Sequence, residues 1–228
     1  MENEHGQPIG EPLDWQGATP PPRVELVGRY CKVVPLSTTH MADLFAATQL
    51  DKAGRNWTYL FENPITNLAD FGKWIEKAIA SKDPLYHAII DAATGRAVGY
   101  ATYMRIDPAM GVIEIGNIHM SPALQGTRAA TEAMYLLMQQ AFALGYRRYE
   151  WKCDTLNAPS KRAAARLGFT YDGLFRQAVV YKSRNRDTAW FSVIDSDWPA
   201  LRKAFESWLS PENFDEAGKQ KTKLQDIR

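Results

Sequence analysis

Apolar positions recur with two different periods along the chain, and the change from one period to the other predicts the order of the elements. Spacing near two, with β-branched and aromatic residues, predicts strands over 24–35 (broken near Gly28), 86–91, 96–105, 113–120, 148–154, 171–176 (with 179–181 as an extension) and 189–195. Spacing of three and four predicts helices over 40–49, 68–81, 129–144, 159–167 and 198–209. This order predicts an α+β fold, an α/β sandwich in which helices flank one mixed, mostly antiparallel central sheet.

The ends of the chain differ in character from its middle. Residues 1–22 are rich in proline, glycine and polar residues, which predicts an extended N-terminal arm pinned at Trp15. Residues 23–210 carry the periodic pattern and are expected to form one domain, and 211–228 read as a charged C-terminal tail. A chain of 228 residues suits a single domain with a full core.

Composition narrows the classes of function. The chain is 45% apolar and 23% charged with a formal net charge of +1, so overall charge favours neither nucleic acid nor an anionic membrane as a partner. No apolar run approaches the roughly 20 residues of a membrane span. Cys31 and Cys153 lie far apart in sequence and form no metal-binding pattern, so we expect no metal and two buried thiols in a reducing cytoplasm. For the oligomeric state, we expect a monomer or a homodimer.

The stretch from Ile113 to Met134 predicts an anion site. Its strand runs to Met120, Ser121-Pro122 ends it, and a short polar loop from Gln125 to Arg128 leads into a helix. Such a loop presents free backbone N–H groups and the positive end of a helix dipole, which suits phosphate. Taken alone, the same stretch also fits an ordinary strand–turn–helix connection without a ligand.

A second stretch favours the ligand-binding interpretation. Asn157-Ala-Pro-Ser160 opens a helix that Leu167-Gly168-Phe169 closes. Together with the Gln125 to Ala130 loop, it resembles the acetyl-coenzyme-A-binding segments of the GNAT N-acetyltransferase superfamily, in the branch of the ribosomal-protein N-terminal acetyltransferases. The resemblance extends over roughly residues 24–194. It implies two splayed parallel strands, 113–120 and 148–154, and N-acetylation of a primary amine by direct transfer from acetyl-CoA.

The resemblance also assigns the cofactor-binding residues, which are Ile118, His119, Met120, Gln125, Gly126, Thr127, Arg128, Ala129, Ala130, Asn157 and Ser160. Arg128 departs from the family pattern because it stands where the loop usually has a central glycine. Glycine there lets the backbone approach phosphate closely. The arginine side chain could obstruct the loop, point outward, or bind a phosphate itself.

Three side chains are candidates for proton transfer. By the resemblance, Ser160 lies near the sulfur and would protonate the leaving thiolate, although a serine at a helix start also acts as a cap. Glu114 and His119 are the candidate bases, with Glu150 as a third. Strict alternation puts Glu114 and Ile118 on one face of the strand and His119 on the other, unless Gly116 introduces a bulge. A cross-strand ion pair for Glu114 and a structural role for His119 are the alternatives.

Other functional interpretations stay open at this stage. A catalytically degenerate acyl-CoA-binding module is the main alternative, and an interaction protein that uses the proline-rich arm is another. We do not expect Cys153 to carry an acyl group, because no activating partner is nearby in sequence. The family places the aromatic loop from Trp57 to Phe61 opposite the acceptor. The acceptor itself is left open among a protein N-terminus, an amino acid or its nucleotide conjugate, a polyamine and an aminoglycoside, and the lack of an acidic cluster weighs against the last two.

Overall fold

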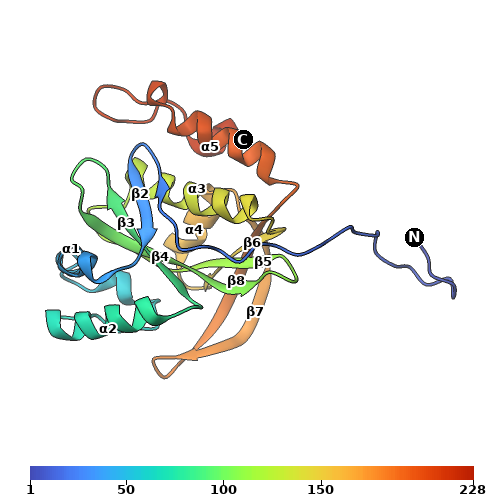
Figure 1. Ribbon diagram of the computed structural model, residues 1–228, viewed down its shortest axis with the longest axis horizontal. Helices are drawn as coiled ribbons and strands as arrows, with labels where there is room; N and C mark the ends of the chain where they lie inside the picture. Colours follow the sequence, from blue (N-terminus) through green and yellow to red (C-terminus); the bar gives the residue numbers. More distant parts are fainter.

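The computed structural model describes residues 1–228 and contains one eight-stranded sheet with helices on both faces (Figure 1). Strand order is β1-β2-β3-β4-β5-β6-β8-β7, and every neighbouring pair is antiparallel except β5 and β6. The strands are β1 (Leu26–Val27), β2 (Cys31–Pro35), β3 (Leu85–Asp91), β4 (Ala97–Asp107), β5 (Val112–Met120), β6 (Arg148–Asp154), β7 (Thr170–Tyr181) and β8 (Arg184–Ile194). The mixed, mostly antiparallel sheet predicted from the sequence is confirmed.

The helices cover the sheet in two groups. One group packs on one face and comprises α1 (Met41–Thr48) and α2 (Leu68–Ala80); the other packs on the opposite face and comprises α3 (Arg128–Ala143), α4 (Ala158–Arg166) and α5 (Trp198–Leu209). A short helix, α6 (Leu224–Ile227), follows α5 near the C-terminus. Three 3-10 turns occupy Thr38–His40, Arg55–Trp57 and Pro211–Asn213. None of the helices is both long and apolar enough to cross a bilayer.

The two faces of the sheet carry separate apolar clusters. The larger cluster joins α3, α4 and α5 to the sheet through residues such as Tyr103, Ile115 and Leu137. The smaller one joins α1 and α2 to β3 and β4 through Phe71, Ile75 and Tyr100 among others. Helices therefore bury both faces of the central strands, and the polar residues of β5 and β6 that are buried, such as Glu114 and Glu150, need partners inside the fold.

The last two strands differ from the sequence prediction. Residues 170–181 form one long strand with an irregularity between Phe175 and Val179, where Gln177 has φ +50°. With β8 it makes a long hairpin that projects beyond the rest of the sheet (Figure 1). The alternating pattern breaks at the irregularity, so sequence periodicity divided this strand in two.

Both ends of the chain contact the domain. Trp15 donates its indole N–H to the Ala109 carbonyl oxygen at 2.8 Å, and this contact pins the arm. Residues before it extend away from the body (Figure 1). The segment after residue 210 is charged as expected, yet it folds back and buries Phe214 and Leu224 in the larger apolar cluster.

Candidate active site

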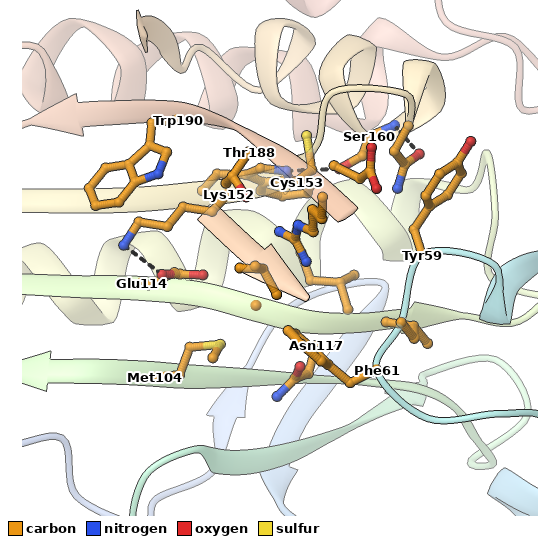
Figure 2. Close-up of a pocket in the computed structure, with 18 of the residues that line it drawn as sticks. Tyr59, Phe61, Met104, Glu114, Asn117, Lys152, Cys153, Ser160, Thr188 and Trp190 are labelled. Carbon is orange, nitrogen blue, oxygen red and sulfur yellow. Dashed lines mark hydrogen bonds and ion pairs between the residues drawn. The ribbon is translucent and has the colours of Figure 1, made fainter. Parts of the chain in front are cut away.

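The central feature of the site is the divergence of β5 and β6. The two parallel strands pair only from Val112–Arg148 to Ile115–Trp151, and beyond these pairs their ladder ends. A cavity of about 460 Å³ lies at this divergence, lined by Gly116 to Ile118 of β5 and Lys152 to Asp154 of β6. The β7–β8 hairpin and the loop between α1 and α2 complete its walls (Figure 2). The predicted pair of splayed parallel strands is therefore present.

A bulge in β5 sets which side chains face each layer. Tyr100 pairs with His119 and Thr102 pairs with Gly116, so Asn117 and Ile118 both lie opposite Ala101. Asn117 adopts φ +45° at this bulge. The extra residue returns His119 to the face of Glu114, whereas Ile118 packs against the cluster of the other face. The bulge that the sequence analysis allowed at Gly116 is therefore present, and strict alternation along β5 ends at that residue.

Glu114 is held in an ion-pair chain that runs through the cavity wall. Its Oε2 contacts Arg105 Nη1 at 2.6 Å and Lys152 Nζ at 2.9 Å, and Lys152 also contacts Glu150 Oε2 at 2.7 Å. Figure 2 shows Lys152 reaching from β6 to Glu114 on β5. The ammonium group also lies 3.8 Å from the centre of the Trp190 ring. The cross-strand ion pair considered from the sequence is therefore present, and Glu114 Oε1 is left without a hydrogen bond.

Ser160 lies in the cavity wall at the start of α4, and Figure 2 places it near Tyr59 and away from Trp190. Its hydroxyl oxygen accepts a hydrogen bond from the Trp151 indole N–H at 2.9 Å. The helix cap is instead Asn157, whose side-chain oxygen accepts the Ser160 backbone N–H at 3.1 Å. The expectation that Ser160 acts as a cap is corrected, because Asn157 fills that position. The Ser160 hydroxyl lies beside the Cys153 thiol and partly offsets the rise of that thiol's pKa by burial.

His119 lies outside the cavity lining. Its ring is sandwiched between Tyr100, with centroids 5.2 Å apart, and Trp57, with centroids 4.8 Å apart. Only 1% of the residue is exposed, and neither ring nitrogen has a hydrogen-bond partner. Burial lowers the pKa of His119 to about 4. This environment suits the structural alternative, because no ligand in the cavity would meet the ring directly.

The start of α3 offers three free backbone donors. Thr127 caps the helix by accepting the Ala130 N–H at 3.1 Å. The N–H groups of Gly126, Arg128 and Ala129 make no hydrogen bond within the protein. Gly126 has φ +72° and open space where a Cβ would stand. The loop therefore exposes N–H groups at the positive end of the α3 dipole, as the anion-site prediction requires.

Arg128 does not project across this loop. Its guanidinium lies 4.5 Å from the centre of the Tyr30 ring and 4.8 Å from that of Phe214. A hollow of about 350 Å³ lies beside the start of α3, and Arg29, Tyr30 and Arg128 are among its lining residues. Of the three alternatives for Arg128, the structure fits an outward side chain that stacks on aromatic rings.

The other predicted cofactor residues fall into two groups. Ile118 and Asn157 line the cavity, whereas Ala129 and Ala130 are buried in the first turn of α3. The Met120 carbonyl accepts the side-chain amides of Gln125, at 2.9 Å, and Asn56, at 3.1 Å. Gln125 therefore fixes the loop to the end of β5, which positions the free N–H groups.

Several cavity residues escaped the sequence analysis. Asp154 ends β6, and its carboxylate accepts the Tyr181 hydroxyl at 2.9 Å and the Leu156 N–H at 2.8 Å. Its place at the end of the second splayed strand was a usable signal. Lys152 and Arg186 had no such signal, because exposed strand residues are often charged and only tertiary packing buries these two.

The aromatic loop behaves partly as expected. Tyr59 and Phe61 line the cavity, while Trp57 is buried against His119. Lys182 of the β7–β8 hairpin donates to the Trp57 carbonyl at 2.6 Å, which ties the hairpin to this loop. Burial raises the pKa of the Cys153 thiol, so the structure gives this cysteine no activation as a nucleophile.

Comparison with known proteins decides the family. Residues 32–170 match the acetyltransferase (GNAT) domain, and these residues include β5, the α3 loop and all of α4. The chain belongs to the GNAT acetyltransferase family. A crystal structure of a GCN5-related N-acetyltransferase from Brucella melitensis shares 51% identity with this acetyltransferase, with a TM-score of 0.92 over 94% of this chain and 98% of that one. The resemblance inferred from the sequence motifs is therefore confirmed.

More distant structures share the fold of this GNAT protein. One is a microcin self-immunity acetyltransferase solved in complex with acetyl-CoA and AMP, at 20% identity and a TM-score of 0.65 over 73% of this chain and 93% of that one. Another is an acetyltransferase from Salmonella typhimurium that modifies the N-terminal serine of a ribosomal protein, at 19% identity and a TM-score of 0.63 over 73% and 96%. Among proteins of curated function, none matches the sequence.

Proposed function

We propose that this acetyltransferase moves an acetyl group from acetyl-CoA directly to a primary amine. The observation that carries the proposal is the continuity of three features around the end of β5: the gap between β5 and β6, the cavity at that gap, and the free N–H groups that open α3. Family membership and the acetyl-CoA bound by a distant relative support the choice of donor.

The chain's residues fit such a donor. The N–H groups of Gly126, Arg128 and Ala129 would hold the pyrophosphate, because they converge at the positive end of a 16-residue helix. The hollow beside Arg29 and Tyr30 has room for the nucleotide end. The cavity between β5 and β6 would take the pantetheine arm and bring the thioester toward Ser160.

Transfer needs a new bond between the amine nitrogen and the acetyl carbon, and loss of the bond between that carbon and sulfur. In this proposal Ser160 donates its hydroxyl proton to the departing sulfur and regains a proton from solvent. The indole N–H of Trp151 holds the Ser160 oxygen, and in this proposal the hydroxyl turns its proton from the neighbouring Cys153 sulfur to the departing sulfur. Glu114, through the free Oε1, takes the proton released by the amine by way of water. The buried His119 has no part.

The proposal is tested by a thiol-release assay with acetyl-CoA and a panel of primary amines, with mass-spectrometric detection of acetylated product. We expect turnover on at least one amine. Acetyl-CoA should also raise the melting temperature by mass action, and dephospho-CoA and pantetheine should raise it progressively less. Binding without turnover on any amine would favour the alternative, a degenerate acyl-CoA-binding module. Equal stabilisation by pantetheine alone would contradict the assignment of the α3 loop.

A further inference from the structure

The cavity contains one buried cation that the protein leaves without a partner. Arg186 of β8 is only 8% exposed, lines the cavity, and makes no ion pair and no hydrogen bond. Its Nε is fully buried and unpartnered. Its only charge-related contacts are with the Phe61 and Tyr181 rings, at 5.7 and 5.9 Å, near the outer limit for a cation over an aromatic face.

The other charged groups of the cavity are already engaged. Arg105 and Lys152 pair with Glu114, and Asp154 accepts two hydrogen bonds. No carboxylate oxygen lies within ion-pair distance of the Arg186 guanidinium. A buried, unpaired charge is costly, and folded proteins keep one chiefly where a ligand supplies the counter-charge.

A second orphan polar group lies on the same strand. The Thr188 hydroxyl is buried and has no hydrogen-bond partner, and Thr188 lines the cavity two residues from Arg186 (Figure 2). Residues two apart on a strand point to the same face. A guanidinium and a hydroxyl side by side match the two oxygens of a carboxylate, because the planar guanidinium donates to both and the hydroxyl adds a third donor.

We propose that the acceptor is a small amine that also bears a carboxylate, which Arg186 and Thr188 bind. This inference rests on the proposed function and specifies its substrate class. The Phe61, Phe175 and Trp190 side chains line the same cavity and would contact an apolar body between the carboxylate and the amine. Polyamines and aminoglycosides are the wrong class, because their surplus positive charge would meet the unpaired Arg186.

A carboxylated amine can be a free amino acid or a peptide N-terminus, and the choice of substrates distinguishes the two. A free amino acid carries an α-carboxylate, whereas a peptide N-terminus offers a carboxylate only from an acidic side chain. Rates are measured with L-phenylalanine, L-phenylalaninamide, 2-phenylethylamine and a dipeptide amide whose only carboxylate is a glutamate side chain. We expect the free amino acid to exceed its amide by about 10- to 100-fold in kcat/KM, the range for hydrogen bonds to charged groups.

Variants tie that preference to the arginine. Arg186→Gln should raise KM for the carboxylated amine by a similar factor with a smaller change in kcat, and should bring the acid-to-amide ratio close to one. Arg186→Lys should retain part of the preference. Arg184→Gln is the matched control, since Arg184 is exposed on the same hairpin and makes no contact with the cavity. A wild-type enzyme that uses the amide or 2-phenylethylamine equally well would overturn the inference while leaving the proposed function intact.

A binding measurement separates this inference from the reaction. In the presence of CoA, calorimetric titration with 3-phenylpropanoate should show binding that 3-phenylpropanamide lacks and that Arg186→Gln abolishes. If acetyl transfer fails with every amine, this result still supports the carboxylate site and only the proposed function falls. Equal binding of the two probes, or binding of neither, contradicts the carboxylate site.

Discussion

At the scale of single residues, the site depends on what each polar side chain is already bonded to. Glu114 and Asp154 are engaged by neighbours, and the Ser160 hydroxyl lies between the Trp151 indole and the Cys153 thiol, while Arg186 keeps an unpaired charge. The residue types at these positions were visible in the sequence, but their partners were not. Roles in proton transfer and binding therefore follow from the contacts rather than from the motif.

Ser160→Ala tests the proposed proton donor. Because the hydroxyl accepts the Trp151 N–H and does not cap α4, the change should leave the helix intact and destabilise the fold by about 1–3 kcal/mol through the unpartnered indole. At saturating acetyl-CoA, kcat should fall about 100-fold. Denaturant unfolding measures the first effect, and steady-state kinetics measures the second. A folded variant with unchanged kcat would assign the proton to water instead.

Arg128→Ala tests where that side chain acts. Its guanidinium stacks on Tyr30 and Phe214, so its loss should lower the free energy of unfolding by about 1 kcal/mol. Acetyl-CoA affinity should change by less than about threefold, because in the proposed site the backbone N–H groups contact the phosphate and the substitution keeps them. Denaturant unfolding and calorimetry check both numbers. A tenfold or greater loss of affinity would show that the guanidinium itself binds phosphate.

At the scale of elements, the bulge in β5 and its neighbour β4 position the cavity. The bulge lies across from Ala101, and Gly99 lies two residues earlier on β4, where it pairs with Met120. A Cβ at Gly99 would stand 2.6 Å from the His119 carbonyl oxygen and 2.8 Å from a Leu124 methyl group. This glycine therefore lets β4 pack against both the end of β5 and the start of the loop before α3.

Gly99→Ala should accordingly damage both stability and acetyl-CoA binding. We expect a loss of about 1–3 kcal/mol in the free energy of unfolding, because overpacking displaces backbone as well as a side chain. Gly173→Ala is the control, since a Cβ there meets nothing within 4 Å. Urea titrations of both variants, with and without acetyl-CoA, make the comparison. Equal midpoints for the two variants would contradict the role given to Gly99.

At the scale of the whole molecule, two buried histidines make stability depend on pH. Burial lowers the pKa of both His87 and His119 to about 4, against about 6.5 when unfolded. Asp51 opposes the shift at His119, and Arg23 adds to the one at His87. As the pH falls below about 6.5, the two histidines become protonated in the unfolded state but stay neutral in the folded state. The free energy of unfolding therefore falls between pH 6.5 and 4, and the histidines do not change it above pH 6.5.

We predict a loss of up to about 1.4 kcal/mol per pH unit for each histidine between those values. Denaturant midpoints measured from pH 7.5 to 4.5 give the slope. His119→Phe keeps the stack on Tyr100 and should reduce the dependence of unfolding free energy on pH by the contribution of one histidine. His5→Phe, at an exposed position, should leave that dependence unchanged. A wild-type slope equal to that of His119→Phe would contradict the prediction.

The sequence by itself determined the order of the elements, the fold class and the strand–loop–helix start that exposes free N–H groups. These follow from local signals: the period of apolar residues, the Asn157 helix start, and the free donors that any strand–loop–helix start presents. The C-terminal segment and the long β7 were less accessible, because charge and a strand irregularity mask buried positions such as Phe214 and Leu224.

Only the tertiary structure decided which groups share the cavity. One extra residue at Asn117 changes the face of every later side chain in β5, and sequence alternation cannot place such a bulge. Lys152 pairs with Glu114, which lies 38 positions earlier in the chain, whereas Arg186 finds no partner. Both outcomes depend on how β5, β6 and β8 pack. Charge and hydrogen bonding act through distance in space, so the site's chemistry was fixed only when the sheet was assembled.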